Sequence, residues 1–467
     1  MSNVGVMMAQ AVYDMLFTAY TKTLPGVQQG SEEGQKFVIL DWNGPVIDTA
    51  ALNNAWSLSN PTGTQEAARY FSDLVDPIPS VSSIYEPNGN KVSQLYEQVV
   101  NSQVIPPPPN PEAEQRYKAA YDFLHTQVPN LDDDGNPVKP GNPQNLPVTI
   151  PDDSQIVKIY RKKVQAYNNA VTALMAAYSQ YDMSKPQDQR SWSLLAPTLQ
   201  QPVKDAWDDL QAARASKIES AVATLAQEAD NQAALVLNNA KRNFYGWRRG
   251  NPEEPNSIFL PSFANPGNWY SSQSDGWTQI TFSSEKLVLD RNSSFQNYGG
   301  SAGFSFGFFS IGGGGGHSEQ QAHLDEQTSR ILVSFEYKRV DIRRPWLDFQ
   351  VFNMKGWRTN AYGPGGYSNG TFTSNHGAFP LLPTAFIVAR NVRITANWGK
   401  TDMDYAKSVT RAGGGLSFGP FQLSGSYSSS SESKKFSSQF ENGAIFRPQM
   451  QILGWLTRVV PYSPKSA

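Results

Sequence analysis

The spacing of apolar residues changes near residue 250, and this change restricts the fold more than any other feature of the chain. Before it, apolar residues recur every three or four positions, which is typical of amphipathic helices. After it, apolar and polar residues alternate, which is typical of half-buried strands. We therefore expect an α+β protein, with a helical domain over residues 1–250 and an antiparallel β domain over residues 255–467.

The helical half contains one clearly amphipathic segment and a second long segment predicted to form a helix that packs against it. Apolar residues step by three or four from Ile156 to Tyr178, which predicts a helix that begins after Asp153 and Ser154. A second long helix is predicted from about residue 201 to 243, with Arg214 as a polar break in its apolar side. The two should pack as an antiparallel hairpin. Shorter helices are expected over residues 5–25, 64–75, 90–104 and 112–126, and the rest of the Pro- and Asn-rich stretch 105–153 should form a loop or extended strap.

The β half shows alternation in several short segments. Ile280 and Phe282 share one face of a predicted strand. Further strands are expected around residues 333–337, 392–398 and 446–460.

The β half also contains an internal duplication. Residues 303–313 read GFSFGFFSIGG, and residues 415–425 read GLSFGPFQLSG, an offset of 112 positions. Each copy alternates large apolar residues with Gly or Ser, and each is followed by a Ser- or Gly-rich tail. We therefore expect two copies of one hairpin unit within the β domain.

Two interpretations of these hairpins stay open. In one, each copy covers the core with its apolar face. In the other, the copies form membrane-barrel strands or pair with a second chain, since barrel strands carry about 10 residues of alternating character. This paired Gly/Ser-rich pattern resembles that of β-pore-forming proteins, and the resemblance implies a non-enzymatic, membrane-active protein that oligomerises through these hairpins. The residues that would insert or assemble are Phe304, Phe306, Phe309, Ile311, Leu416, Phe418, Phe421 and Leu423, and the glycines that would let another backbone approach are Gly303, Gly307, Gly313, Gly415, Gly419 and Gly425.

Two other functions are compatible with the same pattern. The hairpins would be permanent contacts between subunits in a self-assembling filament, tube or shell. Alternatively, a Trp-rich β surface would bind a glycan or a protein. A basic strand end at Arg343, Arg344 and Trp346 suits either lipid headgroups or a structural turn, and we favour the turn.

Catalytic and metal chemistry find little support in the sequence. The chain has no cysteine and only four histidines. Three Gly-x-Ser-x-Gly matches lie in Gly/Ser-rich sequence and lack the following helix that a nucleophile elbow needs. We expect no enzyme activity, no catalytic residues, no cofactor, no metal site and no small-molecule substrate.

The charge of the two halves of the chain indicates possible partners, and the N-terminal residues indicate where the protein is located. Residues 255–467 carry 19 basic and 13 acidic side chains, whereas residues 1–254 carry 20 and 28. This asymmetry suits an anionic membrane or contact between subunits, and the net charge of −2 does not suggest nucleic acid. We expect a homo-oligomer. The first 17 residues lack the pattern of a secretion signal, so we expect a chain made soluble, either cytoplasmic or released by a non-classical route.

Overall fold

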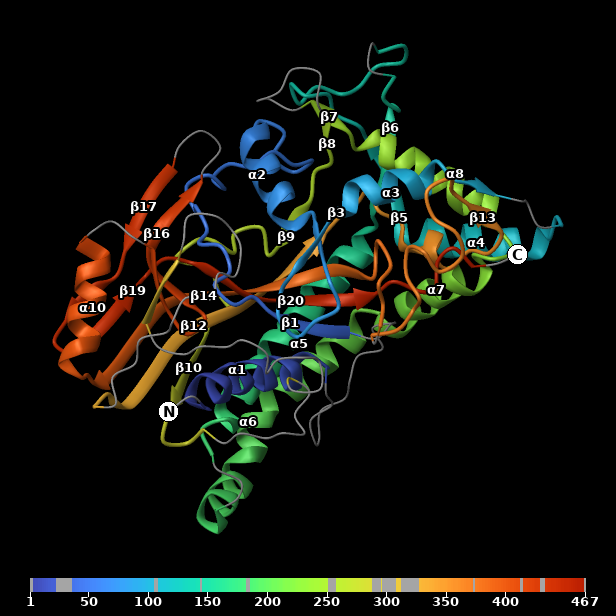
Figure 1. Cartoon of the computed structure of the whole chain (residues 1–467). Coiled ribbons are helices and arrows are strands. Elements are labelled where there is room, and N and C mark those ends of the chain that lie inside the picture. The colour runs from blue at the N-terminus through green and yellow to red at the C-terminus, as the bar shows by residue number, and fades with distance from the viewer. Residues whose placement is uncertain are drawn as a thin grey trace.

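The computed structural model confirms the α+β class (Figure 1). It describes residues 3–21, 36–104, 108–142, 145–181, 185–250, 258–287, 295, 308–311, 327–372, 374–411, 415–428 and 433–465. The described residues form helices and a large antiparallel sheet, and the sheet lies mainly in the C-terminal half of the chain.

The main sheet has eight strands among the described residues. Its order is β1 (Lys36–Leu40), β20 (Gln451–Val459), β14 (Leu381–Asn397), β12 (Ser329–Arg343) and β10 (Thr278–Ser283). Strand β9 (Phe263–Asn265) also pairs with β12, β19 (Ala444–Arg447) pairs with β14, and β18 (Gln439–Glu441) pairs with β19. The predicted strand segments around 280–282 and 333–337 fall within β10 and β12, because the alternation of apolar residues matches the two-residue repeat of a strand. The predicted segment 392–398 overlaps the end of β14, and the segment 446–460 overlaps both β19 and β20.

Side chains from the first half of the chain bury both faces of this sheet. Helices α1 (Asn3–Thr21) and α5 (Gln155–Tyr178) lie along one face, and α2 (Gln65–Val75) lies on the other (Figure 1). The edge strand β1 itself comes from the first half and pairs with β20, with Lys36 opposite Arg458. The hydrophobic core therefore crosses the predicted domain boundary near residue 250.

The remaining helices gather mostly at one end of the sheet, near the C-terminus (Figure 1). They are α3 (Val92–Val100), α4 (Pro111–Leu124), α7 (Ala215–Glu228) and α8 (Ala233–Gly246), with α6 (Pro186–Ala212) projecting beside α5 and α10 (Lys400–Arg411) at the opposite end. A short 3₁₀ helix covers Phe349–Phe352. Two-stranded ribbons join β2 (Pro77–Pro79) to β3 (Pro87–Lys91), β4 (Gln103–Val104) to β13 (Trp357–Arg358), β5 (His125–Pro129) to β6 (Thr149–Asp153), and β7 (Arg249–Gly250) to β8 (Ile258–Phe259).

The prediction of a single second long helix over residues 201–243 was wrong. Helix α6 already begins at Pro186 and ends at Ala212, and α7 and α8 follow as separate helices. The first break lies at Arg214, whose φ of 62° is left-handed and cannot continue a right-handed helix. The predicted helix from about residue 154 to 178 is observed as α5, and α6 packs against it.

Candidate functional site

The two copies of the repeat lie beside each other in a second sheet. This four-stranded sheet has the order β11 (Phe308–Ile311), β15 (Gly415–Phe418), β16 (Phe421–Ser428) and β17 (Ser433–Ser437). Strand β11 from the first copy pairs antiparallel with β15 from the second, with Phe308 opposite Phe418 and Ile311 opposite Gly415. The two copies therefore share one sheet.

The apolar side chains of the second copy lie in the core of the protein. Leu416, Phe418, Phe421 and Leu423 are at most 1% exposed. The ring of Phe421 lies 5.0 Å from that of Phe335 on β12. This is the position that the core-covering interpretation predicts, and membrane insertion stays a prediction that requires these side chains to leave the core.

Several predicted residues of the first copy lie outside the described residues. These are Phe304, Phe306, Gly303, Gly307 and Gly313. For Phe309 and Ile311 the structure describes the strand but not the side chains. In the second copy, Gly419 has a left-handed φ of 55° in the turn between β15 and β16. Gly425 lies close to Gly415, since a Cβ on Gly425 would be 3.9 Å from the Cα of Gly415.

Polar contacts from the loop of residues 43–48 hold the second copy in place. The Asn43 amide donates to the Pro420 carbonyl at 3.3 Å, and the Gln422 side-chain amide donates to the Asn43 carbonyl at 2.9 Å. The ammonium of Lys434 on β17 lies 3.0 Å from the Asp48 carboxylate. Both the core and this loop therefore fix the hairpin.

Arg344 and Trp346, which the sequence offered as headgroup ligands or structural residues, make structural contacts. Arg344 donates to the carbonyl of Pro383 at 2.6 Å and to that of Val75, and burial lowers its pKa to about 10. The Trp346 indole is 1% exposed and donates to the Pro261 carbonyl at 3.0 Å.

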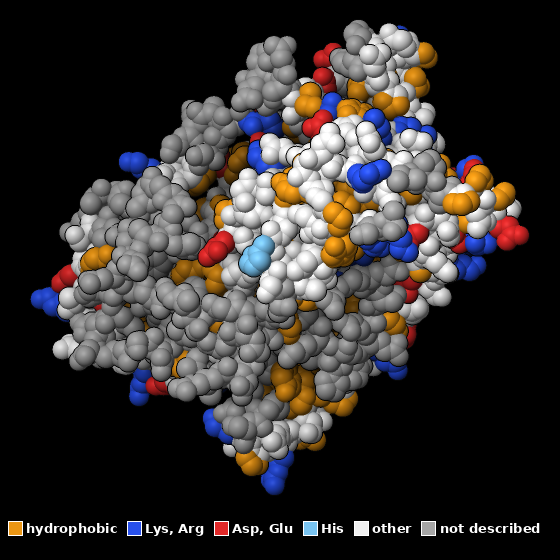
Figure 2. Space-filling view, turned by 45° about the vertical axis from the view of Figure 1, so that its right-hand side comes forward, with side chains coloured by type: hydrophobic (Ala, Val, Ile, Leu, Met, Phe, Trp, Pro, Cys, Tyr) orange, Lys and Arg blue, Asp and Glu red, His pale blue; other side chains and the backbone are white. Residues whose placement is uncertain are grey.

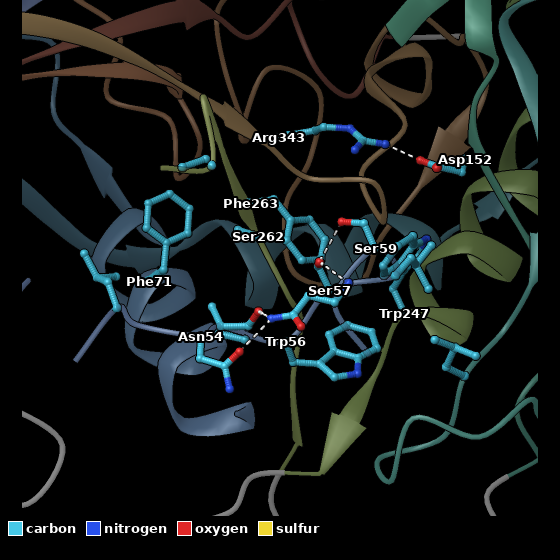
Figure 3. Close-up of a pocket in the computed structure, with 18 of the residues that line it drawn as sticks. Asn54, Trp56, Ser57, Ser59, Phe71, Asp152, Trp247, Ser262, Phe263 and Arg343 are labelled. Atoms are coloured by element: carbon cyan, nitrogen blue, oxygen red, sulfur yellow. Dashed lines mark hydrogen bonds and ion pairs between the residues drawn. The ribbon is translucent and has the colours of Figure 1, made fainter. Parts of the chain in front are cut away.

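Arg343 instead lines a cavity of about 830 Å³. The walls come from the loop of residues 52–60, α2, β5, the start of α5, β9 and the segment after β9. Figure 3 shows Phe71 on one side and Trp247 on the other, with the pair of Arg343 and Asp152 opposite Trp56. A cavity of this volume is within the usual range for a small-ligand site.

Six aromatic side chains are among the residues that line the cavity. The ring of Phe263 lies 6.5 Å from that of Trp56 and 5.8 Å from that of Trp247. Phe71 and Trp269, also in the wall, lie 6.4 Å apart. The indole N–H groups of Trp56 and Trp247 are buried, and neither has an acceptor among the described residues.

The loop of residues 52–60 is held rigid around Trp56. The Asn60 side-chain amide donates to Asn54 Oδ1 at 3.1 Å and to the Ala55 carbonyl at 2.9 Å. The guanidinium of buried Arg249 lies 4.7 Å from the centre of the Trp56 ring, which fixes the indole from the side. The loop therefore presents Trp56 in a defined orientation.

Charged side chains form one end of the cavity. Arg343 donates to Asp152 and lies 3.1 Å from Asp153, and Lys158 lies 2.8 Å from the other oxygen of Asp152. Burial acts to raise the pKa of Asp153, but Arg161 and Arg343 outweigh it, so this pKa lies below its ordinary value. The Asp153 carboxylate is therefore held in the ionised form.

The surface that the structure describes has scattered apolar groups. In Figure 2, hydrophobic side chains form small separate patches among polar and charged ones. The most exposed large apolar residue is Leu194 on α6, at 81%. None of the described helices has the length and hydropathy required to cross a bilayer, and no three acidic or histidine side chains among the described residues converge on a metal position.

The chain matches no protein-family model, no curated protein and no solved structure. The function is therefore inferred from the side chains that line the cavity. Of these, only Arg343 was singled out in the sequence, because the others come from six separate segments whose proximity no local pattern reveals.

Proposed function

We propose that this chain is a carbohydrate-binding protein and that the cavity between Trp56 and Arg343 is its binding site. The observation that carries the proposal is the combination of aromatic walls with a charged, hydrogen-bonding end in one cavity of about 830 Å³. The ligand class is that of the glycan-binding alternative from the sequence, which placed it on a Trp-rich β surface instead.

The chemistry of a sugar ring matches both parts of this cavity. A pyranose has C–H groups on its faces, which pack against aromatic rings, and hydroxyls at its edge, which need hydrogen-bond partners. The half-buried rings of Phe263 and Tyr270, which line the cavity, supply apolar surface for the C–H groups. Asn54, Ser59 and Lys158 line the same cavity and supply hydrogen-bond partners for the hydroxyls.

Titration calorimetry with a panel of neutral and acidic oligosaccharides tests this proposal. Tyr270 is half-buried at the cavity wall, so Tyr270→Ala should weaken binding of the best panel member by about tenfold, the loss typical of a removed aromatic contact. Tyr181→Ala is the matched control, because half-buried Tyr181 contacts Trp192 of α6 and is not part of the cavity. Absence of binding across the panel, or equal weakening by both variants, would refute the proposal.

A second candidate is the membrane-active oligomer that the sequence predicts, with an anionic membrane as partner. The observation that favours it is the pairing of both repeat copies in one sheet, apart from the main sheet. Release of the loop of residues 43–48 would then free the apolar face of β15 and β16 for insertion. Pairing between subunits would be needed to satisfy every backbone group in lipid.

Leakage from anionic liposomes tests this second candidate. Deletion of residues 303–313 should abolish leakage while the monomer stays folded by circular dichroism. Rings seen by electron microscopy only on liposomes would support it, whereas ordered filaments or closed particles in buffer would favour the self-assembling alternative. Leakage that persists after the deletion would contradict the mechanism.

A further inference from the structure

The charged end of the cavity has its acceptors occupied and several of its donors free. Asp152 accepts from Arg343 with Oδ1 and pairs with Lys158 through Oδ2. Arg343 uses Nη2 for Asp152 and Nε for Asp153, which leaves Nη1 without an acceptor among the described residues. A ligand at this end therefore meets donors rather than a free carboxylate.

Lys158 adds further donors at the same place. An ammonium has three hydrogens, and the pair with Asp152 uses one of them. The side chain of Lys158 is 43% exposed, whereas that of Asp152 is 9% exposed, so the ammonium is the more accessible of the two. Arg161 is paired with Asp153 at 2.8 Å, so the group of five side chains has three positive and two negative charges.

We infer that the sugar bound in this cavity carries an anionic group, a carboxylate or a sulfate, which lies against Lys158 and Arg343. The inference rests on the proposed carbohydrate-binding function. Anionic oxygens accept charge-assisted hydrogen bonds from ammonium and guanidinium groups, and these are stronger than bonds between neutral partners. A cationic sugar is not favoured, because both oxygens of Asp152 already have partners.

The test uses three matched ligands and one conservative variant. The ligands are a hexasaccharide that contains uronic acids, the same hexasaccharide after reduction of its carboxyl groups, and a sulfated hexasaccharide. The variant is Lys158→Gln, and the control is Lys162→Gln, which changes an exposed lysine one turn further along α5. Because Lys158 is partly exposed, the variant should keep the fold.

We expect the full chain to bind at least one anionic hexasaccharide about tenfold or more tightly than the reduced one. Lys158→Gln should remove most of this preference, and Lys162→Gln should keep it. Preference for the uronic acid or for the sulfate identifies which anion the site takes. Equal binding of anionic and reduced ligands would overturn the inference and leave the proposed function standing, whereas no binding of any hexasaccharide would contradict both.

Discussion

The carboxylate of Asp48 pairs with the ammonium of Lys434 at 3.0 Å, although the two residues are 386 positions apart in the chain. Asp48 is 3% exposed in its side chain and also accepts a hydrogen bond from the Ala50 amide at 3.1 Å. The pair joins the loop after β1 to the outer strand of the repeat sheet. It gives a direct way to measure how firmly that sheet is held.

Lys434→Met should lower the free energy of unfolding by about 1–2 kcal/mol, because it leaves the buried Asp48 carboxylate without this cation. This cost is smaller than the roughly 3–5 kcal/mol of a broken, fully buried pair, since Lys434 is 40% exposed. Lys435→Met is the control, because the neighbouring Lys435 is exposed. Denaturant unfolding measures both, and equal stability of the two variants would show that the pair contributes nothing.

Phe421→Ala should cost about 3–5 kcal/mol of stability, because the side chain is 1% exposed and packs on Phe335. Ser426→Ala, at an exposed position of the same strand, should change stability by less than about 0.5 kcal/mol. Chemical denaturation of both variants is the measurement. A negligible cost for Phe421→Ala would place this side chain outside the core in solution and favour the membrane-active candidate.

Asp41 should make the fold less stable as the pH rises. Its carboxylate is 5% exposed and accepts from the Trp455 indole at 2.8 Å. Burial raises its pKa from 3.8 to about 7, against the opposing effect of the Trp455 hydrogen bond. Between these two values the folded state holds a proton that the unfolded state has lost, so this contribution to stability is full below pH 3.8 and is lost as the pH rises to 7.

Asp41→Asn removes this titration and keeps an acceptor for the indole. Relative to the unmodified chain, the variant should therefore gain about 2–3 kcal/mol between pH 5 and pH 8. Unfolding curves at both pH values test this, with Asp122→Asn at an exposed position as the control. A constant stability difference across this range would mean that Asp41 titrates as an ordinary carboxylate.

Arg214→Gly should leave stability unchanged or raise it by up to about 1 kcal/mol. Arg214 has a φ of 62°, where a Cβ is unfavourable and glycine has no such cost. Arg214→Val should destabilise by more than about 1 kcal/mol, because a β-branched side chain fits this conformation poorly. Thermal unfolding of the two variants distinguishes them, and the reverse order would contradict the break between α6 and α7.

The elements that the sequence predicted well are those with a long uninterrupted periodicity. Helix α5 repeats one pattern over its whole length, so local spacing is sufficient. Strands β12 and β14 were predicted only in part, around residues 333–337 and 392–398, where apolar and polar residues alternate, and the almost fully buried start of β14 was missed. The break at Arg214 was missed because the apolar spacing continues past it while the backbone does not. Strand β1 was missed because its five residues are almost all buried, and a short apolar run does not distinguish a strand from a buried helix.

The cavity was not predictable from sequence for a different reason. Trp56 and Trp247 are close to the same Phe263 ring but lie almost two hundred positions apart. Their proximity results from the packing of α2, α8 and β9, not from any local pattern. Arg343 was recognised as a basic residue near an aromatic, but its pairing with Asp152 depends on β6 lying beside β12.

Hydrogen–deuterium exchange of the full chain, with and without a pool of neutral and acidic hexasaccharides, tests the central claim most directly. If the cavity binds carbohydrate, protection should increase in residues 52–60, 128–131 and 262–270, which line it, and should stay unchanged in α6. Unchanged exchange in these three segments at saturating sugar, or protection confined to other parts of the chain, would contradict it.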